Sequence, residues 1–438
     1  SDVVGFVVTV AATPEIYALP RHAPLPIAGR VIDLAPPGDN FMRGAAWTLI
    51  GLAAWTGSDL ATAHRTYSQG MAYLQQAGFT SDVVGGAVAL ADIRLAQGRL
   101  REARDTYARG LQLATPPGQP ALRGAADMHV GLSDIARERN DLDAAAHHLR
   151  QSAELGELNG LPKNPYRSRV AAARLLAARG EFDGALDLLD EAERVYEGDF
   201  SPNTRPVGAL RARLWLLAGR TDEAQAWARG QGLAAGANPG YLREYEYITL
   251  ARLLLSSGAP DEALGLLARL GRAAEGGDRA GSLLEILILQ ALAYDRQDDR
   301  PVALAHLASA LALAEPEGYV RLFVDEGAAM ARLLAAAAQG VAPAYTGRLL
   351  AALSAEQPAP AADAPPAAPT PSPLIEPLSP RELEILRLFN TELSGPEIAE
   401  HLVVGLSTVR THTKSIYSKL NVNSRRAAVR RAVELGLL

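Results

Sequence analysis

Between about residues 41 and 313, apolar and small side chains recur with a period of about 40 residues. The clearest copies have an alanine, a larger residue four positions later and a small residue three positions after that, as in Ala63, Tyr67 and Gly70, and the other copies keep the last two positions more loosely. The leading alanines are Ala63, Ala103, Ala145, Ala185, Ala224, Ala263 and Ala303. Spacings of three and four residues place these positions on one face of a helix.

A turn signal precedes most of these alanines, and an apolar helical stripe precedes each turn. The turn signals are Gly57-Ser58-Asp59, Gly98-Arg99, Asn140-Asp141, Gly180-Glu181, Gly219-Arg220 and Gly258-Ala259-Pro260. Each unit is therefore predicted to be a helix, a stop and a second helix whose alanine lets its partner approach closely. Because a lone helix pair cannot bury its apolar face, the units must stack into an all-α solenoid. The pattern resembles tetratricopeptide repeats (TPR), lengthened from about 34 residues to about 40.

The rest of the chain divides around this solenoid. After a stretch at 315–327, a last Ala/Leu-rich helix pair is expected to end near residue 353. Eight prolines among alanines then predict a semi-extended linker, because such a composition neither continues a helix nor forms a core. We therefore expect an unassigned segment at 1–40, a TPR-like domain at 41–353, a linker at 354–377 and a separate domain at 378–438.

Residues 378–438 divide into four short helical segments. Ser379-Pro380-Arg381-Glu382 is a capping box with proline at the first helical position, and 394–397 forms a second capping box. A third helix is expected from 407 or 408 to 420, and a fourth from 424 to about 435. A helix, a short turn and a basic second helix make a helix-turn-helix.

The positive charge of the chain is concentrated in this last domain. From Leu378 onward there are nine Lys or Arg and six Glu, a net +3 in a chain whose formal net charge is −6. The residues before it therefore carry −9. A basic cluster in an acidic chain indicates nucleic-acid binding, although many such clusters are only solvated faces.

The third helix has one buried and one exposed face. Val409, Ile416 and Leu420 form its predicted buried stripe. The opposite face presents the side chains predicted to read DNA bases, which are those of Arg410, Thr411 and Lys414. Arginine and lysine can donate to guanine, and the threonine methyl can contact a thymine methyl.

A second set of residues is predicted to contact DNA phosphates. Ser407 and Thr408 lie at the start of the third helix, where hydroxyls and free amides bind anions. Lys419, Ser424 and Arg425 lie near the start of the next helix. His412 borders the buried stripe, so it is either a phosphate contact or a structural histidine. These predicted phosphate contacts are Ser407, Thr408, His412, Lys419, Ser424 and Arg425.

Several classes of function have no support in the sequence. The chain has no cysteine, which excludes disulfides and thiolate metal sites and fits a cytoplasmic location. No lysine follows a glycine, so there is no phosphate-binding P-loop. His147 and His148 have no partner at metal-ligand spacing, and Asp141/Asp143 and Asp298/Asp299 look like repeat turns. We therefore predict no enzyme activity, no catalytic residues, no metal and no cofactor in this chain.

The role of the solenoid is open at this stage. It is either a spacer or a surface that binds an inducer, a small molecule or a protein. Tyr241, Tyr245, Tyr247 and Arg243 are candidate groove residues, and ordinary packing explains them equally well.

The C-terminal domain resembles the LuxR-type helix-turn-helix. The matching positions are Leu378-Ser379-Pro380-Arg381-Glu382, Glu397-Ile398-Ala399, Thr408-Val409-Arg410-Thr411-His412, Ile416 and Lys419-Leu420. The repeat region is similar to the solenoid of the large MalT-like group within this family. Four residues depart from the LuxR pattern, and they are Glu392, Gly395, Pro396 and Gly405. Glycine at 405 replaces a capping serine, a change that should cost only a few tenths of a kcal/mol.

The resemblance implies a transcriptional activator that dimerises on double-stranded promoter DNA and recruits RNA polymerase. In the large regulators an N-terminal ATPase module switches the protein. The chain begins with Ser1 and shows no such module, so we expect a fragment, with ATP binding only if a further N-terminal module exists. The alternative is a TPR-like interaction scaffold whose DNA-binding tail is vestigial.

Overall fold

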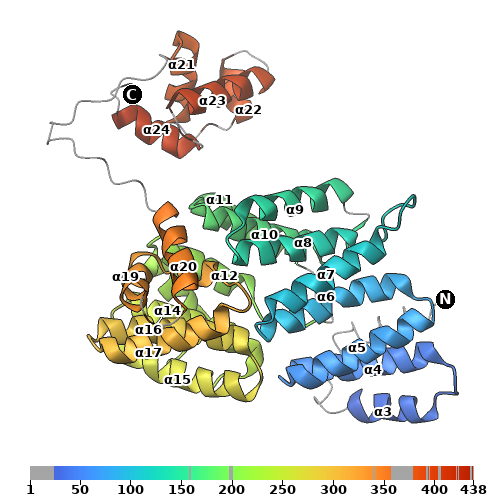
Figure 1. Cartoon of the computed structure of the whole chain (residues 1–438). Coiled ribbons are helices and arrows are strands. Elements are labelled where there is room, and N and C mark those ends of the chain that lie inside the picture. The colour runs from blue at the N-terminus through green and yellow to red at the C-terminus, as the bar shows by residue number, and fades with distance from the viewer. Residues whose placement is uncertain are drawn as a thin grey trace. The chain divides into compact units, whose positions relative to one another are not determined.

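The computed structural model describes residues 24–156, 159–196, 201–338, 340, 342–356, 378–390, 393, 395–402, 406–420, 422, 424–434 and 437. Throughout these ranges the regular secondary structure is helical, which confirms the all-α prediction. The chain separates into two compact units, 1–357 and 358–438. We call them the repeat unit and the C-terminal unit and describe each by itself (Figure 1). In the described ranges, no helix combines the length and the apolar character that crossing a membrane requires.

The repeat unit is a series of helix pairs. The first helices of the pairs are α4 (Asn40–Thr56), α6 (Thr80–Ala96), α8 (Ala125–Glu138), α10 (Asn164–Ala178), α12 (Val207–Leu217), α14 (Glu244–Ser256) and α16 (Ala280–Arg296). The second helices are α5 (Leu60–Gln76), α7 (Leu100–Ala114), α9 (Leu142–Leu155), α11 (Phe182–Arg194), α13 (Thr221–Gly230), α15 (Pro260–Gly276) and α17 (Arg300–Ala314). A short 3-10 helix, η2 (Tyr241–Arg243), leads into α14.

The predicted period is confirmed position by position. Each of the seven leading alanines is the fourth residue of a second helix, and each has 0% of its surface exposed. Two residues before each of these helices, the backbone is left-handed, with φ between 59° and 78°. The residues at these positions are glycine, asparagine, serine or aspartate. Glycine and asparagine adopt the left-handed conformation most readily. The Asp298/Asp299 pair is such a turn, since Asp299 caps α17 by accepting a hydrogen bond from Val302 N–H at 3.3 Å.

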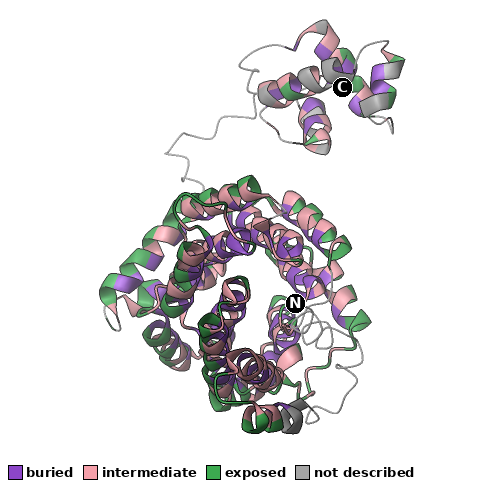
Figure 2. Cartoon of the chain, turned by 90° about the vertical axis from the view of Figure 1, so that its right-hand side faces the viewer, coloured by how far each residue is buried: buried purple, intermediate pink, exposed green. Residues whose placement is uncertain are grey.

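The helix pairs wind into a superhelix whose successive turns touch (Figure 2). Trp55 Nε1 donates to Tyr241 Oη at 3.2 Å, and Gln97 Nε2 donates to Asp278 Oδ2 at 2.7 Å. Val320 N–H donates to the Glu138 carbonyl at 2.8 Å. These three contacts join residues 186, 181 and 182 positions apart, so one turn of the superhelix takes about four and a half repeats.

Backbone meets backbone where the two turns are closest. A Cβ placed on Gly98 would lie 2.8 Å from Gly281 N, and one placed on Gly281 would lie 2.9 Å from the Leu95 carbonyl oxygen. Gly98 also has φ of +76°. Only glycine fits this corner, because a side chain would push the turns apart.

The first and last helices extend the repeat unit beyond its predicted limits. Helix α3 (Pro24–Leu34) packs against α4, so part of the unassigned segment 1–40 belongs to this unit. At the other end lie α18 (Arg321–Val324), α19 (Gly327–Ala337) and α20 (Pro343–Glu356). Helix α20 takes the first three residues of the predicted linker, and the rest of that linker lies outside the described residues.

The C-terminal unit contains the four predicted helices. They are α21 (Pro380–Phe389), α22 (Gly395–His401), α23 (Leu406–Leu420) and α24 (Arg425–Glu434). The first capping box forms in full, with Glu382 N–H donating to Ser379 Oγ at 3.3 Å and Ser379 N–H donating to Glu382 Oε2 at 2.6 Å. Ser394, which opens the second predicted box, and Gly405 lie outside the described residues. One apolar core joins all four helices.

Candidate nucleic-acid interface

Helix α23 has the buried face that the sequence predicts. Val409, Ile416 and Leu420 are 2%, 0% and 3% exposed, and they pack in the core with residues of α21, α22 and α24. This burial fixes the rotation of α23 about its own axis. Lys414 lies on the other side and is exposed, so one of the three predicted base-reading side chains faces outward.

The remaining residues at the start of α23 can be placed only by their backbone. Ser407, Thr408, Arg410 and Thr411 lie in the first two turns of the helix, but their side chains fall outside the described part of the structure. Their helical spacing puts Ser407, Arg410, Thr411 and Lys414 on one face. The roles of Ser407, Thr408, Arg410, Thr411 and Lys414 in DNA binding all stay predictions.

A single carboxylate, that of Glu382, fastens α23 to the start of α21. Besides the capping bond, Glu382 accepts hydrogen bonds from Ser415 Oγ at 2.6 Å and Lys419 Nζ at 2.9 Å. Burial raises the pKa of Glu382, but these hydrogen bonds and that from Ser379 outweigh burial and lower its pKa to about 2. The carboxylate is therefore ionised at neutral pH and sets the position of α23 against α21.

Three of the predicted phosphate contacts have roles inside the domain. Lys419 pairs with Glu382, and its side chain is 15% exposed. Arg425 donates to the carbonyl oxygens of Phe389 and Leu388 at 2.9 Å each and to that of Leu393, which closes the C-terminal end of α21. Ser424 Oγ accepts a hydrogen bond from Ala427 N–H at 3.2 Å and so caps α24.

These contacts inside the domain make Lys419 and Arg425 less available for DNA phosphates than the sequence suggested. A guanidinium that satisfies three carbonyls is costly to withdraw, because it would leave partly buried acceptors without this donor. Lys419 and Arg425 therefore position the helices, and phosphate binding by either stays a prediction. Exposed Ser424 and half-buried His412 also keep that prediction. Sequence spacing missed the contacts of Lys419 and Arg425 because each joins residues 32 or more positions apart.

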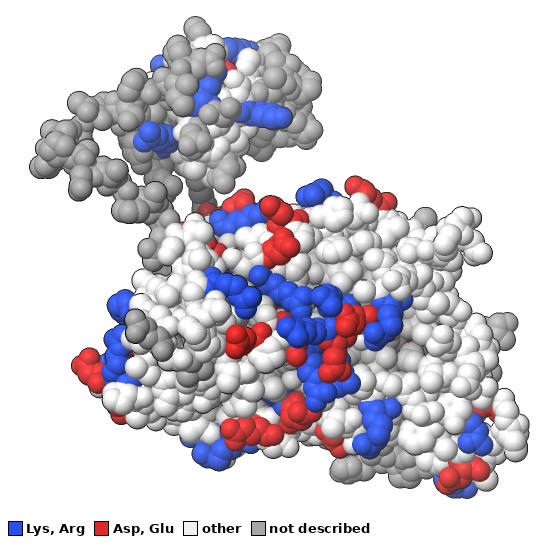
Figure 3. Space-filling model, in the orientation of Figure 1, with Lys and Arg blue, Asp and Glu red and all other residues white. Residues whose placement is uncertain are grey.

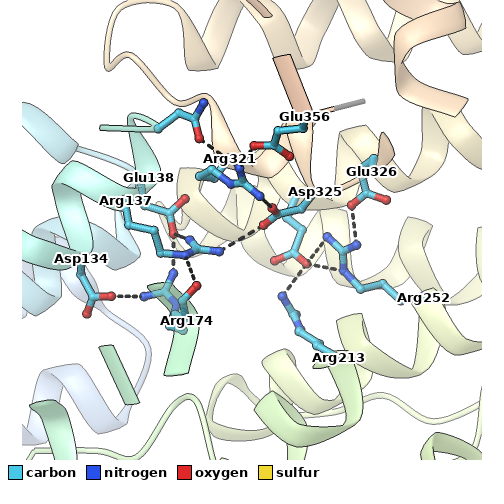
Figure 4. A network of polar contacts seen from close by, with 12 residues as sticks. Asp134, Arg137, Glu138, Arg174, Arg213, Arg252, Arg321, Asp325, Glu326 and Glu356 are labelled. Atoms are coloured by element: carbon cyan, nitrogen blue, oxygen red, sulfur yellow. Dashed lines mark hydrogen bonds and ion pairs between the residues drawn. The ribbon is translucent and has the colours of Figure 1, made fainter. Parts of the chain in front are cut away.

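The repeat unit holds a second concentration of polar chemistry, in the interior of the superhelix (Figure 4). Arg174 pairs with Asp134 at 2.5 Å and with Glu138, and Arg137 reaches from Glu138 at 2.9 Å to Asp325 at 3.1 Å. Since Asp325 belongs to the next turn, this chain of pairs joins two turns. It ends at Arg321, which pairs with Asp325 and with Glu356, the last residue of α20.

A neighbouring cluster is centred on Glu285. Glu285 Oε1 pairs with Arg213 and Arg252 at 2.8 Å each, and Arg252 also pairs with Glu326. Burial raises the pKa of Glu285, but the two guanidiniums outweigh burial and hold it at about 2. Burial raises the pKa of Glu326 above its ordinary value, and Arg252 offsets only part of that rise.

Of the four candidate groove residues, two line cavities and two do not. Tyr241 and Tyr245 line interior cavities of the superhelix. Tyr247 is 5% exposed and belongs to the core, and Arg243 pairs with Glu246 at 2.5 Å. His148 has a partner that the sequence did not indicate, because its Nδ1 lies 3.0 Å from Nδ1 of His129.

Comparison with known families decides where the chain belongs. The family model described as "MalT-like TPR region" matches residues 24–340. The chain belongs to the MalT-like family. A second model, "Bacterial regulatory proteins, luxR family", matches residues 376–432 of this MalT-like chain. Both resemblances predicted from the sequence are thereby confirmed.

Curated relatives agree with this assignment. The MalT-like chain is 27% identical over 364 residues to a protein of Serratia proteamaculans (strain 568) named HTH-type transcriptional regulator MalT. It is 26% identical over 364 residues to a protein of the same name from Yersinia pestis (strain Pestoides F). Each match covers 78% of this chain and 40% of the relative. The chain thus spans about two fifths of the length of these relatives.

Proposed function

We propose that this MalT-like chain is a DNA-binding transcriptional regulator, acting as an activator in the cytoplasm. The observation that carries the proposal is the placement of α23. It follows α22 as the second helix of a helix-turn-helix, buries one stripe and turns Lys414 outward, in a unit matched by the luxR family model. The first turns of such a helix enter the major groove.

In this proposal Arg410, Thr411 and Lys414 read base edges. Ser407, Thr408 and His412 contact phosphates, and Ser424 adds a contact at the start of α24. Lys419 and Arg425 act mainly by fixing α23 and α24, with any phosphate contact secondary. Seven basic residues and one acidic residue from Gly405 onward supply the attraction to DNA.

The proposed division of labour follows the predicted domains. The TPR-like domain at 41–353 senses an inducer, the linker at 354–377 joins it to the DNA-binding domain at 378–438, and two copies of that domain bind promoter DNA and engage RNA polymerase. ATP would act only through a further module, since the described residues contain no P-loop sequence.

A salt-titrated gel shift of the whole chain on promoter fragments tests the proposal. Arg410→Ala and Lys414→Ala should each weaken binding to the preferred fragment at least about fivefold, because a base contact contributes about 1–3 kcal/mol. Arg387→Ala is the matched control. Arg387 is an exposed arginine on α21, and its loss should change affinity by less than about twofold.

Two results would overturn the proposal. One is the absence of salt-sensitive DNA binding, which would favour an interaction scaffold with a vestigial DNA-binding tail. The other is binding that Arg410→Ala and Lys414→Ala leave unchanged.

A further inference from the structure

The interior of the superhelix contains a cavity of about 230 Å³, next to the polar network. Its walls come from α8, α10, α11, α12, α14 and α16, together with residues 322–326 of the next turn. The volume equals that of roughly eight water molecules in the liquid. The cavity is therefore the size of a small metabolite and too narrow for a folded partner.

The chemistry of the wall is sharply divided. Twelve of the lining residues are leucine or alanine, five are arginine and three are acidic. The arginines are Arg137, Arg174, Arg213, Arg252 and Arg296. Figure 3 shows basic and acidic side chains gathered across the middle of one face of the repeat unit, in a surface that is otherwise mostly uncharged. Apolar walls with a few convergent polar groups are typical of small-molecule sites.

The five arginines differ in how far carboxylates neutralise their positive charge. Arg137 and Arg174 share Glu138, and Arg213 and Arg252 share Glu285. The side chain of Arg296, at the exposed end of α16, forms no hydrogen bond or ion pair with a described residue. It stands at the rim with Leu217 and Ser256, the last residues of α12 and α14, which are also exposed.

Arg213 is already oriented for a planar acceptor. Its guanidinium carbon lies 3.6 Å from the centre of the Tyr245 ring, and its Nε donates to Thr249 Oγ1 at 2.8 Å. Its Nη2 is buried and has no hydrogen-bond partner in the described structure. A buried donor without an acceptor is uncommon, and a bound carboxylate or phosphate would satisfy it.

We propose that this cavity binds a small organic anion with an apolar body, whose carboxylate or phosphate pairs with Arg213 and Arg296. The leucines enclose the apolar body. The inference rests on the proposed function, in which the repeat unit senses an inducer, and it gives that inducer a chemical class.

Calorimetric titration of the whole chain at constant ionic strength tests the inference with four probes. They are benzoate, phenyl phosphate, acetate and the neutral benzyl alcohol. Benzoate or phenyl phosphate should bind at least about tenfold more tightly than benzyl alcohol, and also more tightly than acetate, which lacks the apolar body. Whichever of the two anions binds more tightly shows whether the ligand carries a carboxylate or a phosphate.

Two variants and two matched controls localise the binding. Arg296→Gln and Arg213→Lys should each weaken binding of the preferred anion at least about fivefold. The controls are Arg229→Gln, another exposed arginine in the last turn of a helix, and Arg211→Lys, which lies on α12 but pairs with Asp190 and Glu193. Both controls should bind the anion like the wild type.

The inference is overturned if neither aromatic anion binds more tightly than benzyl alcohol. It is also overturned if both cavity variants bind the anion as the wild type does. A gel shift on the same preparations separates this failure from that of the proposed function, because a chain that binds DNA without binding anions loses only the cavity proposal.

Discussion

The two units of this chain hold their helices together in opposite ways. The repeat unit uses the same contact seven times, an alanine with no exposed surface at the fourth position of each second helix. The C-terminal unit adds to its apolar core a single buried carboxylate, Glu382, which joins the start of α21 to Ser415 and Lys419 of α23. In the repeat unit, stability is spread over many equivalent sites. In the smaller C-terminal unit, Glu382 joins several groups and so acts as a hub, and one substitution there should have a large effect.

The largest effect should follow the loss of that hub. Glu382→Ala removes a helix cap and the partner of Lys419, so we expect the C-terminal unit to lose about 2–4 kcal/mol of unfolding free energy. Urea denaturation followed by circular dichroism measures this. Glu384→Ala is the control, since Glu384 is 50% exposed and its one ion pair among the described residues is with Arg381 at the surface, a pair worth less than about 1 kcal/mol. Equal effects of the two changes would show that Glu382 is no hub.

The contact between superhelical turns should give the next largest effect. Gly98→Ala and Gly180→Ala both place a side chain at a positive φ, at +76° and +78°, which costs about 1–2 kcal/mol. Only the Gly98 substitution meets the other turn, because nothing lies within 4 Å of a Cβ at Gly180. We therefore expect Gly98→Ala to destabilise the repeat unit by a further 1–3 kcal/mol or so. Indistinguishable thermal unfolding of the two variants would remove the turn-to-turn contact as a source of stability.

Acid should test the role of Glu382 in a third way. Glu382 has a pKa of about 2 in the folded unit, below that of an unfolded glutamate at about 4.3. Its stabilising contribution is therefore complete above about pH 4.3 and is lost as the pH falls toward 2. Unfolding of the wild type and of Glu382→Gln at pH 7, 4 and 3 should converge toward acid pH. A stability difference that stays constant over this range would contradict the assignment.

The smallest effect should come from separating the units. Deleting residues 358–438 keeps Glu356 and its pair with Arg321, so the melting temperature of the repeat unit should change by less than about 2 °C. Differential scanning calorimetry of the two lengths measures the change. A large fall would mean that the two units stabilise each other.

The sequence could predict the features that depend on residues close together in the chain, and not those that depend on distant residues. The period of the alanines, the turns and the buried stripe of α23 all depend on residues within one helix or one turn, so spacing alone identifies them. The capping half of Glu382's role was predictable for the same reason. Its bonds to Ser415 and Lys419 were not, because they join positions 33 and 37 residues apart.

The contacts inside the superhelix could not be predicted from the sequence either, because they also join residues far apart in the chain. Trp55 with Tyr241 and Arg137 with Asp325 meet only because one superhelical turn takes about four and a half repeats, a number set by small rotations between neighbouring helix pairs. Nothing in the repeat pattern marks these residues as partners. The cavity and its arginines therefore became visible only in three dimensions.

The close approach of Gly98 to Gly281 also bears on how the chain folds. Repeat proteins ordinarily fold through contacts between neighbouring repeats, which are short in sequence and form quickly. The corner at Gly98 instead depends on a segment 183 residues later in the chain, so it can close only after the intervening repeats have formed. During synthesis the first four repeats should therefore lack this closing contact until α16 is complete, and that late closure is where misfolding would concentrate.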